Sequence, residues 1–94
     1  MFAKASYKIL TRQGPAADGG ALDYMVRGKM IGGFALVAYP AEYRNSGVMT
    51  FIVNYAGAIF QKDMGPDTTQ RAERMISFNP DQTWQKVTDI TPLQ

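Results

Sequence analysis

Residues 32–54 read GGFALVAYPAEYRNSGVMTFIVN and contain the two runs of sequence that most resemble β-strands. Residues 34–39 and 48–54 are rich in Phe, Val and Ile, which favour extended structure. Pro40 lacks the N–H that a central strand needs, so the first strand is predicted to end just before it. Segment 40–47 then forms a loop between two antiparallel strands, and it is longer than a tight hairpin requires.

Three weaker runs complete the expected sheet. Strands are predicted at residues 7–11, 22–26 and 58–62, the last pairing back after a turn at 54–57. In the C-terminal tail, the alternation through Val87 and Ile90 predicts one more short strand.

An amphipathic segment predicts one helix over residues 67–78. Asp67 is favourable beside the positive N-terminal end of a helix, and Pro80 is expected to stop the helix. Apolar residues at helical spacing mark its inner side: Ala72, Met75 and Ile76.

Together these elements predict an α+β fold. It consists of an antiparallel sheet of about four to five strands, with one helix from the C-terminal half of the chain packed on one face. A length of 94 residues allows one domain with one core. We therefore expect a single small domain over 1–94, with its core at about 7–87.

Both faces of the two strong strands are apolar, whereas a strand with one face in water alternates apolar and polar residues. The helix can cover only one face. The other is expected to be covered either by the N-terminal segment and the Trp84 tail or by a second copy of the chain. Burying such side chains is worth about 1.5–3 kcal/mol each, and a homodimer is the solution we prefer. The residues predicted for self-association are Phe34, Leu36, Val37, Met49, Phe51 and Val53.

The composition argues against several kinds of chemistry. The chain has no Cys and no His, so it lacks thiol nucleophiles, imidazole bases and the commonest ligands of transition metals. We expect no cofactor and no metal site, and no apolar run is long enough to span a membrane. A net charge of +2 is too small to predict nucleic-acid binding, which needs basic residues gathered on one surface. Those residues would be Lys4, Lys8, Arg12, Arg27 and Lys29.

The first candidate site is the segment YPAEY at 39–43. In a functional interpretation, the rings of Tyr39 and Tyr43 stack on a sugar or a peptide and Glu42 orients it. In the simpler interpretation, which we prefer, the tyrosines pack on the sheet edge and Glu42 lies in solvent.

The second candidate site is the pair Asp63 and Asp67, two carboxylates four residues apart across a turn. Two carboxylates can divide acid and base roles between them, and their oxygens suit Ca²⁺. An Asp at the start of a helix is also ordinary capping, and we prefer that interpretation. The Gly-rich segments at 14–20 and 28–33 lack the spacing of nucleotide-binding loops, so we assign no catalytic residue.

Several motifs resemble a known family. They include QGPAA at 13–17, MIGGFALVA at 30–38, PAEY at 40–43, SGVMTFIVN at 46–54 and KDMGPDT at 62–68. Over about residues 7–87 the chain is similar to the bacterial family known as domain of unknown function 2950. Ala56 stands where that family usually has Asp, which puts a ligand role for this turn in doubt.

The resemblance implies a module similar to the C-terminal part of longer, exported proteins. The activity of that family is not established, so the resemblance implies no reaction. The chain itself shows no signal peptide and as written is expected to be cytoplasmic. A weaker, fold-level similarity is to the globular sheet of bacterial pseudopilins.

We therefore expect a small, non-catalytic interaction module that self-associates through its sheet. The alternative is a domain that binds cell-envelope polymers or hydrolyses them with carboxylates. For hydrolysis, the available groups are Glu42, Asp63 and Asp67. The expected partner is a second copy, with an unknown protein or envelope component as the alternative, and nucleic acid is not expected.

Overall fold

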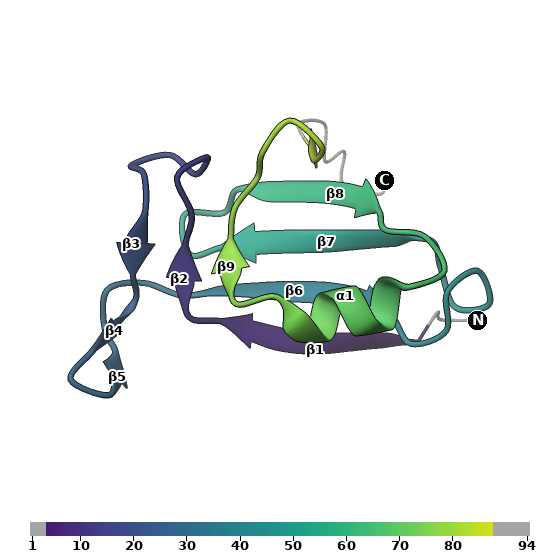
Figure 1. Cartoon of the computed structure of the whole chain (residues 1–94), viewed down its shortest axis with the longest axis horizontal. Helices are drawn as coiled ribbons and strands as arrows, with labels where there is room; N and C mark the ends of the chain where they lie inside the picture. The colour runs from purple at the N-terminus through teal and green to yellow at the C-terminus, as the bar shows by residue number, and fades with distance from the viewer. Residues whose placement is uncertain (1–3, 88–94) are drawn as a thin grey trace, which may run out of the picture.

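The computed structural model describes residues 4–87 and contains a five-stranded antiparallel sheet with one helix on it (Figure 1). The strand order is β1-β6-β7-β8-β10. These strands are Ala5–Leu10 (β1), Ala35–Pro40 (β6), Met49–Asn54 (β7), Ile59–Asp63 (β8) and Gln85–Lys86 (β10). The structure thus confirms the α+β fold and an antiparallel sheet of five strands, although the predicted strand at 22–26 is not part of it.

Short strands lie near one end of the main sheet, and some of them pack on its face. A three-stranded group has the order β3-β2-β9, in which β2 and β9 are parallel, and β4 and β5 form a separate hairpin. They span Arg12–Gln13 (β2), Leu22–Asp23 (β3), Met25–Val26 (β4), Lys29–Met30 (β5) and Ser77–Phe78 (β9). In Figure 1 the β4–β5 hairpin projects beyond the left end of the main sheet.

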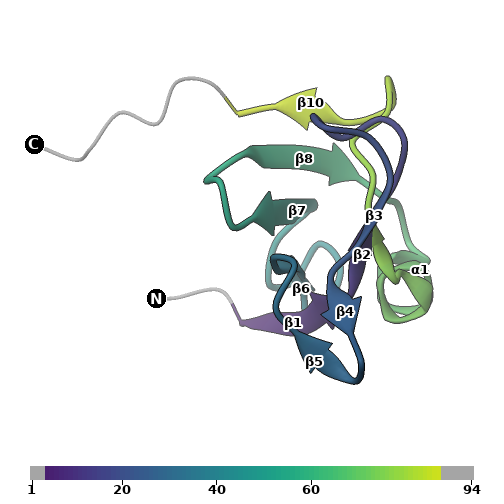
Figure 2. The ribbon, with the colours of Figure 1, turned by 90° about the vertical axis from the view of Figure 1, so that its left-hand side faces the viewer.

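The helix α1 (Thr68–Arg74) packs on one face of the main sheet, chiefly over β6. Figure 2 shows α1 and the strands β2 and β9 on the same side of this sheet. Strand alternation decides which side chains enter the layer between them: Ile52 is 0% exposed, whereas its neighbour Phe51 is 36% exposed. The core cluster consists of Leu10, Ala17, Tyr24, Ala35, Val37, Tyr39, Ile52, Ala72 and Phe78.

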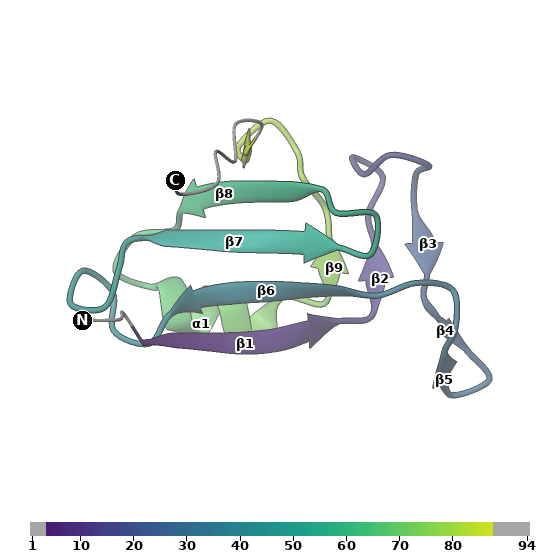
Figure 3. The same ribbon diagram turned by 180° about the vertical axis from the view of Figure 1, so that it is seen from behind.

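Among residues 4–87 no helix lies on the opposite face of the main sheet, as the rear view in Figure 3 shows. We call it the open face. The cross-strand register places the alternate residues of four strands on it. Its apolar residues are Tyr7, Ile9, Leu36, Ala38, Met49, Phe51, Val53 and Ile59.

A lysine from β1 supports the C-terminal end of α1. The Lys8 Nζ donates hydrogen bonds to the carbonyl oxygens of Glu73 and Met75. The last carbonyls of a helix have no partner within it and carry partial negative charge, so a cation is favourable there. This contact joins the helix to the edge of the sheet.

The helix is shorter than predicted. It was expected over 67–78 but ends at Arg74, and Met75 already has extended geometry (φ −70, ψ 136). Residues 77–78 pair instead with β2, which places Phe78 in the core. Pro80 therefore does not end the helix. Asp67 occupies the N-cap position, but its side chain makes no capping hydrogen bond.

Three other strand predictions need correction. The run 22–26 is divided between β3, which pairs with β2, and β4, which pairs with β5, and the intervening Tyr24 is fully buried. β6 includes Pro40, whose pairing with β1 requires no N–H, and the β6–β7 ladder ends at Ala38. The last strand is Gln85–Lys86 rather than an alternation through Val87, and Ile90 lies outside the described residues.

Candidate functional site

The loop at 41–47 is closed by its own hydrogen bonds. The amide of Glu42 donates to the Ser46 Oγ, and the amide of Ser46 donates to the Glu42 carbonyl, both at 2.9 Å. Arg44 has a positive φ of 75 and donates its amide to the Gly47 carbonyl at 2.7 Å. The loop thus has a defined shape, set largely by its backbone.

This loop is tied to the end of β8 by Tyr43 and Asp63. The Tyr43 hydroxyl donates to the Asp63 Oδ1 at 2.6 Å, and the same oxygen accepts from the Gly65 amide at 2.9 Å. The Arg44 guanidinium carbon lies 5.6 Å from the centre of the Tyr43 ring. Of the five predicted ligand-binding residues, these two are the ones joined by a hydrogen bond.

The contact changes the acidity of both groups. The hydrogen bond from Tyr43, and next that from the Gly65 amide, lower the pKa of Asp63 below its ordinary value of 3.8. The hydrogen bond to Asp63 raises the pKa of Tyr43 above 10.0. Asp63 is therefore held as a carboxylate at neutral pH and is poorly suited to act as a general acid.

The other predicted ligand-binding residues lie apart from this pair. Tyr39 belongs to the core and is 7% exposed. Glu42 and Asp67 are both exposed. Among residues 4–87 there is no group of three acidic side chains that could hold a metal ion.

The predicted self-association residues fall mostly on the open face. Leu36, Met49, Phe51 and Val53 belong to it, and Phe34 precedes β6 at a position that alternates with Leu36. Val37 does not belong to the open face, because it points toward the helix and is fully buried.

Sequence analysis missed two of the most exposed apolar residues of the open face. Tyr7 and Ile9 on β1 are 69% and 53% exposed. The alternation within the run 7–11 could have predicted them. In a strand, Tyr7 and Ile9 lie on one side and Lys8 lies on the other.

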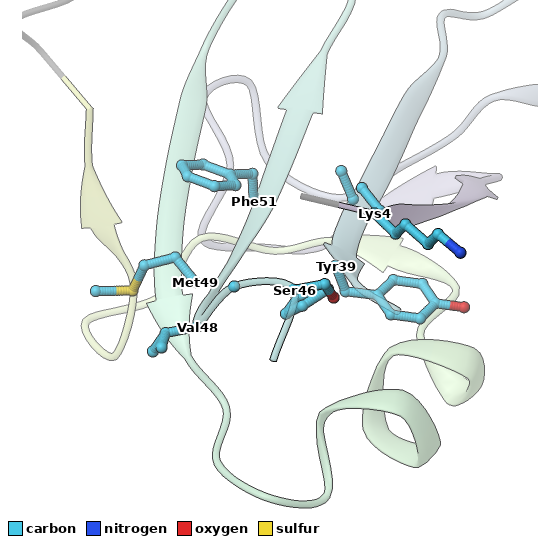
Figure 4. Close-up of a pocket in the computed structure, with 10 residues that line it drawn as sticks. Lys4, Tyr39, Ser46, Val48, Met49 and Phe51 are labelled. Carbon is cyan, nitrogen blue, oxygen red and sulfur yellow. The ribbon is translucent and has the colours of Figure 1, made fainter. Parts of the chain in front are cut away.

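A shallow apolar groove lies at one end of the open face, beside the 41–47 loop (Figure 4). Its volume is about 260 Å³, and its lining includes Ala5, Ala38, Val48, Met49 and Phe51. The two alanines leave space that larger side chains would fill. In Figure 4 the Tyr39 ring points away from Met49 and Phe51, in agreement with its burial on the helix side.

A second cleft, of about 380 Å³, lies next to the turn between β7 and β8. Tyr55, Phe60 and Phe78 contribute aromatic surface to it, and Asp18 and Lys86 contribute opposite charges. The buried Gln13 also lines it, but its amide is fully engaged. The Gln13 Oε1 accepts from the Tyr24 hydroxyl at 2.9 Å, and the Nε2 donates to two loop carbonyls.

The basic residues of the N-terminal half are spread along the molecule. Lys4 lies at the start of β1, near one end of the main sheet, whereas Arg27 and Lys29 belong to the β4–β5 hairpin at the other end (Figure 1). Lys8 is used to support α1.

In the described residues, no helix is both long and apolar enough to cross a membrane.

Comparison with known proteins identifies a family but no characterised relative. No curated protein and no solved structure matches the chain, so the similarity to pseudopilins is not confirmed. One family model, described as "Protein of unknown function (DUF2950)", matches residues 2–87. This range includes the whole main sheet and α1, and the chain therefore belongs to the DUF2950 family.

Proposed function

We propose that the protein is a non-catalytic interaction module that associates with a second copy through its open face. The observation that supports this proposal most is the apolar character of that face. Tyr7, Ile9 and Phe51 are each at least 36% exposed on it, and contiguous apolar surface of this kind usually marks an interface.

The described part of the chain does not cover this face. Trp84 was a candidate cover, but it packs at the edge of the core. Its ring lies 5.4 Å from the Lys62 Nζ, and Lys62 shares its sheet face with Thr50, which is buried on the helix side. Trp84 is thus used on the covered side of the sheet.

The size of the open face indicates a reversible contact. Four long strands spaced about 4.8 Å apart, each about six residues of 3.3 Å, give a flat footprint on the order of 400 Å². A standard stable interface buries about 800 Å² of accessible surface on each partner. We therefore expect a dimer that dissociates on dilution.

A charge placed at the centre of the face tests this proposal. Phe51→Glu should weaken dimerisation at least tenfold, because the interface would have to bury an unpaired carboxylate. Ile76→Glu is the matched control, since Ile76 is 52% exposed and follows α1 in the other layer. Sedimentation equilibrium over a hundredfold range of concentration measures both variants. Equal association of wild type and Phe51→Glu would show that the open face is not the dimer contact.

A further inference from the structure

The outer edge of β1 is the long unpaired edge of the main sheet. Among residues 4–87 β1 has β6 as its one neighbour in the sheet, whereas β10 covers part of the edge of β8. β1 lies along the rim of the sheet in Figures 1 and 3.

The hydrogen-bond pattern shows which backbone groups of β1 face outward. Ala41 donates its amide to the Lys4 carbonyl at 3.2 Å, so this pair is one of the hydrogen-bonded pairs of the β1–β6 ladder. Such pairs alternate along antiparallel strands. Ser6, Lys8 and Leu10 therefore bond to β6, while a second set directs both N–H and C=O away from it. The outward set is Ala5, Tyr7 and Ile9.

Proline and a β-bulge, two of the usual devices that protect a sheet edge, are absent from β1, and its inward-pointing Lys8, a third, is engaged by the carbonyls at the end of the helix. Natural edge strands carry prolines, bulges or outward lysines that discourage pairing. β1 has no proline, its register with β6 is continuous over 5–10, and no residue in it has a positive φ. Its lysine, Lys8, is turned toward the helix and bonds carbonyl oxygens there.

We infer that β1 is a strand-addition site for the β1 of a second copy, with Tyr7 opposite Tyr7 about a two-fold axis. Three outward residues pair as 5 with 9, 7 with 7 and 9 with 5, at two hydrogen bonds for each pair, or about six in all. This contact is separate from the face contact proposed above, and copies that use both contacts assemble beyond a dimer.

The charges on β1 select this register. Shifting the pairing by two residues in one direction sets Lys4 opposite Lys8 twice, and shifting it the other way sets Lys8 opposite Lys8. Like charges directly opposite each other destabilise a strand pair. With Tyr7 opposite Tyr7, Lys8 faces Ser6 and Lys4 faces Leu10, so no like charges meet within the strand. The outer edge of β1 can therefore pair with the same edge of a second copy.

Amide hydrogen exchange in the Phe51→Glu variant measures the contact through the edge of β1 without the contact through the open face. We expect this variant to remain dimeric at NMR concentrations, with the amides of Tyr7 and Ile9 protected at least tenfold relative to a dilute sample. The amides of Ser6 and Lys8 should be protected at both concentrations. Unprotected Tyr7 and Ile9 amides at every concentration would overturn the inference.

Two substitutions of Tyr7, each made in the Phe51→Glu variant, distinguish the contribution of its backbone N–H to the edge contact from that of its side chain. Tyr7→Pro removes the outward N–H at the two-fold and should abolish the dimer, whereas Tyr7→Ala keeps the N–H and should retain it. A dimer that survives Tyr7→Pro overturns the inference, and the exchange measurement decides the matter if that variant does not fold.

The outcomes distinguish the two proposals. If Phe51→Glu is monomeric with exposed edge amides and the wild type is dimeric, the face contact stands and the edge contact fails. If wild type and Phe51→Glu associate equally, and both lose association through Tyr7→Pro, the edge contact stands and the face contact fails.

Discussion

At the scale of single residues, Thr50 and Thr68 are both fully buried but differ in the state of their hydroxyl groups. The Thr68 Oγ1 donates to the Gly65 carbonyl at 2.6 Å. The Thr50 Oγ1 makes no hydrogen bond with any residue between 4 and 87. A buried polar group without a partner costs about 1–3 kcal/mol. The hydroxyl of Thr50 therefore lowers the stability of the core, whereas the hydrogen-bonded hydroxyl of Thr68 does not.

Valine has nearly the shape of threonine without the hydroxyl, so it separates these two cases. Thr50→Val should raise the free energy of unfolding by about 1 kcal/mol, because it removes an unsatisfied group. Thr68→Val should lower it by about 1 kcal/mol, because it breaks the hydrogen bond of the hydroxyl and leaves the Gly65 carbonyl with the Thr68 amide as its donor. Urea unfolding at a concentration where the protein is monomeric measures both. A loss of stability in Thr50→Val would contradict the assignment of an unpaired hydroxyl.

The Tyr43–Asp63 contact predicts a titration change. In Tyr43→Phe, the pKa of Asp63 should rise toward 3.8 but stay below it, since the Gly65 amide still donates to the carboxylate. Asp81 is an internal control: its pKa is lowered by hydrogen bonds from Thr83, which the substitution leaves intact. Carboxyl carbon NMR titration reads both groups. An unchanged Asp63 pKa would mean that the hydroxyl does not bond to it in solution.

The same contact gives stability a pH dependence of known sign. Because the folded pKa of Asp63 is depressed, its contribution is present above the unfolded pKa and is lost as the pH falls through the folded pKa. Because the folded pKa of Tyr43 is raised, its contribution is present below pH 10.0 and is lost as the pH rises through the folded pKa. Tyr43→Phe should therefore flatten the stability profile at both ends.

At the scale of elements, the sequence predicted the long strands well because their signal is local. The runs 34–39, 48–54 and 58–62 became β6, β7 and β8 with shifts of one residue at their ends. Short elements were predicted less well, because their structure is decided by distant partners. The pairing of β9 with β2 crosses more than sixty residues, and it overrides the helical spacing that had extended α1 to residue 78.

In the candidate site, too, local features could be predicted from the sequence, whereas features that depend on distant residues could not. Alternation predicted which residues of β7 share a face, but both faces of β6 read as apolar, so the sequence did not show that Val37 is covered by the helix. The bond between Tyr43 and Asp63 joins residues twenty apart, and no local pattern indicates it. The directions of the β1 backbone groups became clear only from the register with β6.

At the scale of the whole molecule, residues 4–87 form a sheet with one face buried and one face exposed. The stability of the monomer therefore comes mainly from the layer between the sheet and the elements on its covered face, which include α1, β2 and β9. Phe51 and Ile52 are neighbours on β7, but they belong to opposite faces and are 36% and 0% exposed. Their roles should differ accordingly, with Ile52 contributing to folding and Phe51 to association.

Alanine substitution at these two positions tests this division of roles. Ile52→Ala should lower the free energy of unfolding by about 2–5 kcal/mol, because it leaves a cavity in the core, a large part of the 5–15 kcal/mol that a small domain has. Phe51→Ala should lower it by less than Ile52→Ala does in dilute solution, because a ring that is 36% exposed loses less burial than a fully buried side chain. Urea unfolding measured at low and high protein concentration separates the two effects. Phe51→Ala should lose stability mainly at high concentration, where dimerisation stabilises the wild type by mass action. Equal and concentration-independent losses in both variants would mean that the open face is part of the monomer's own core.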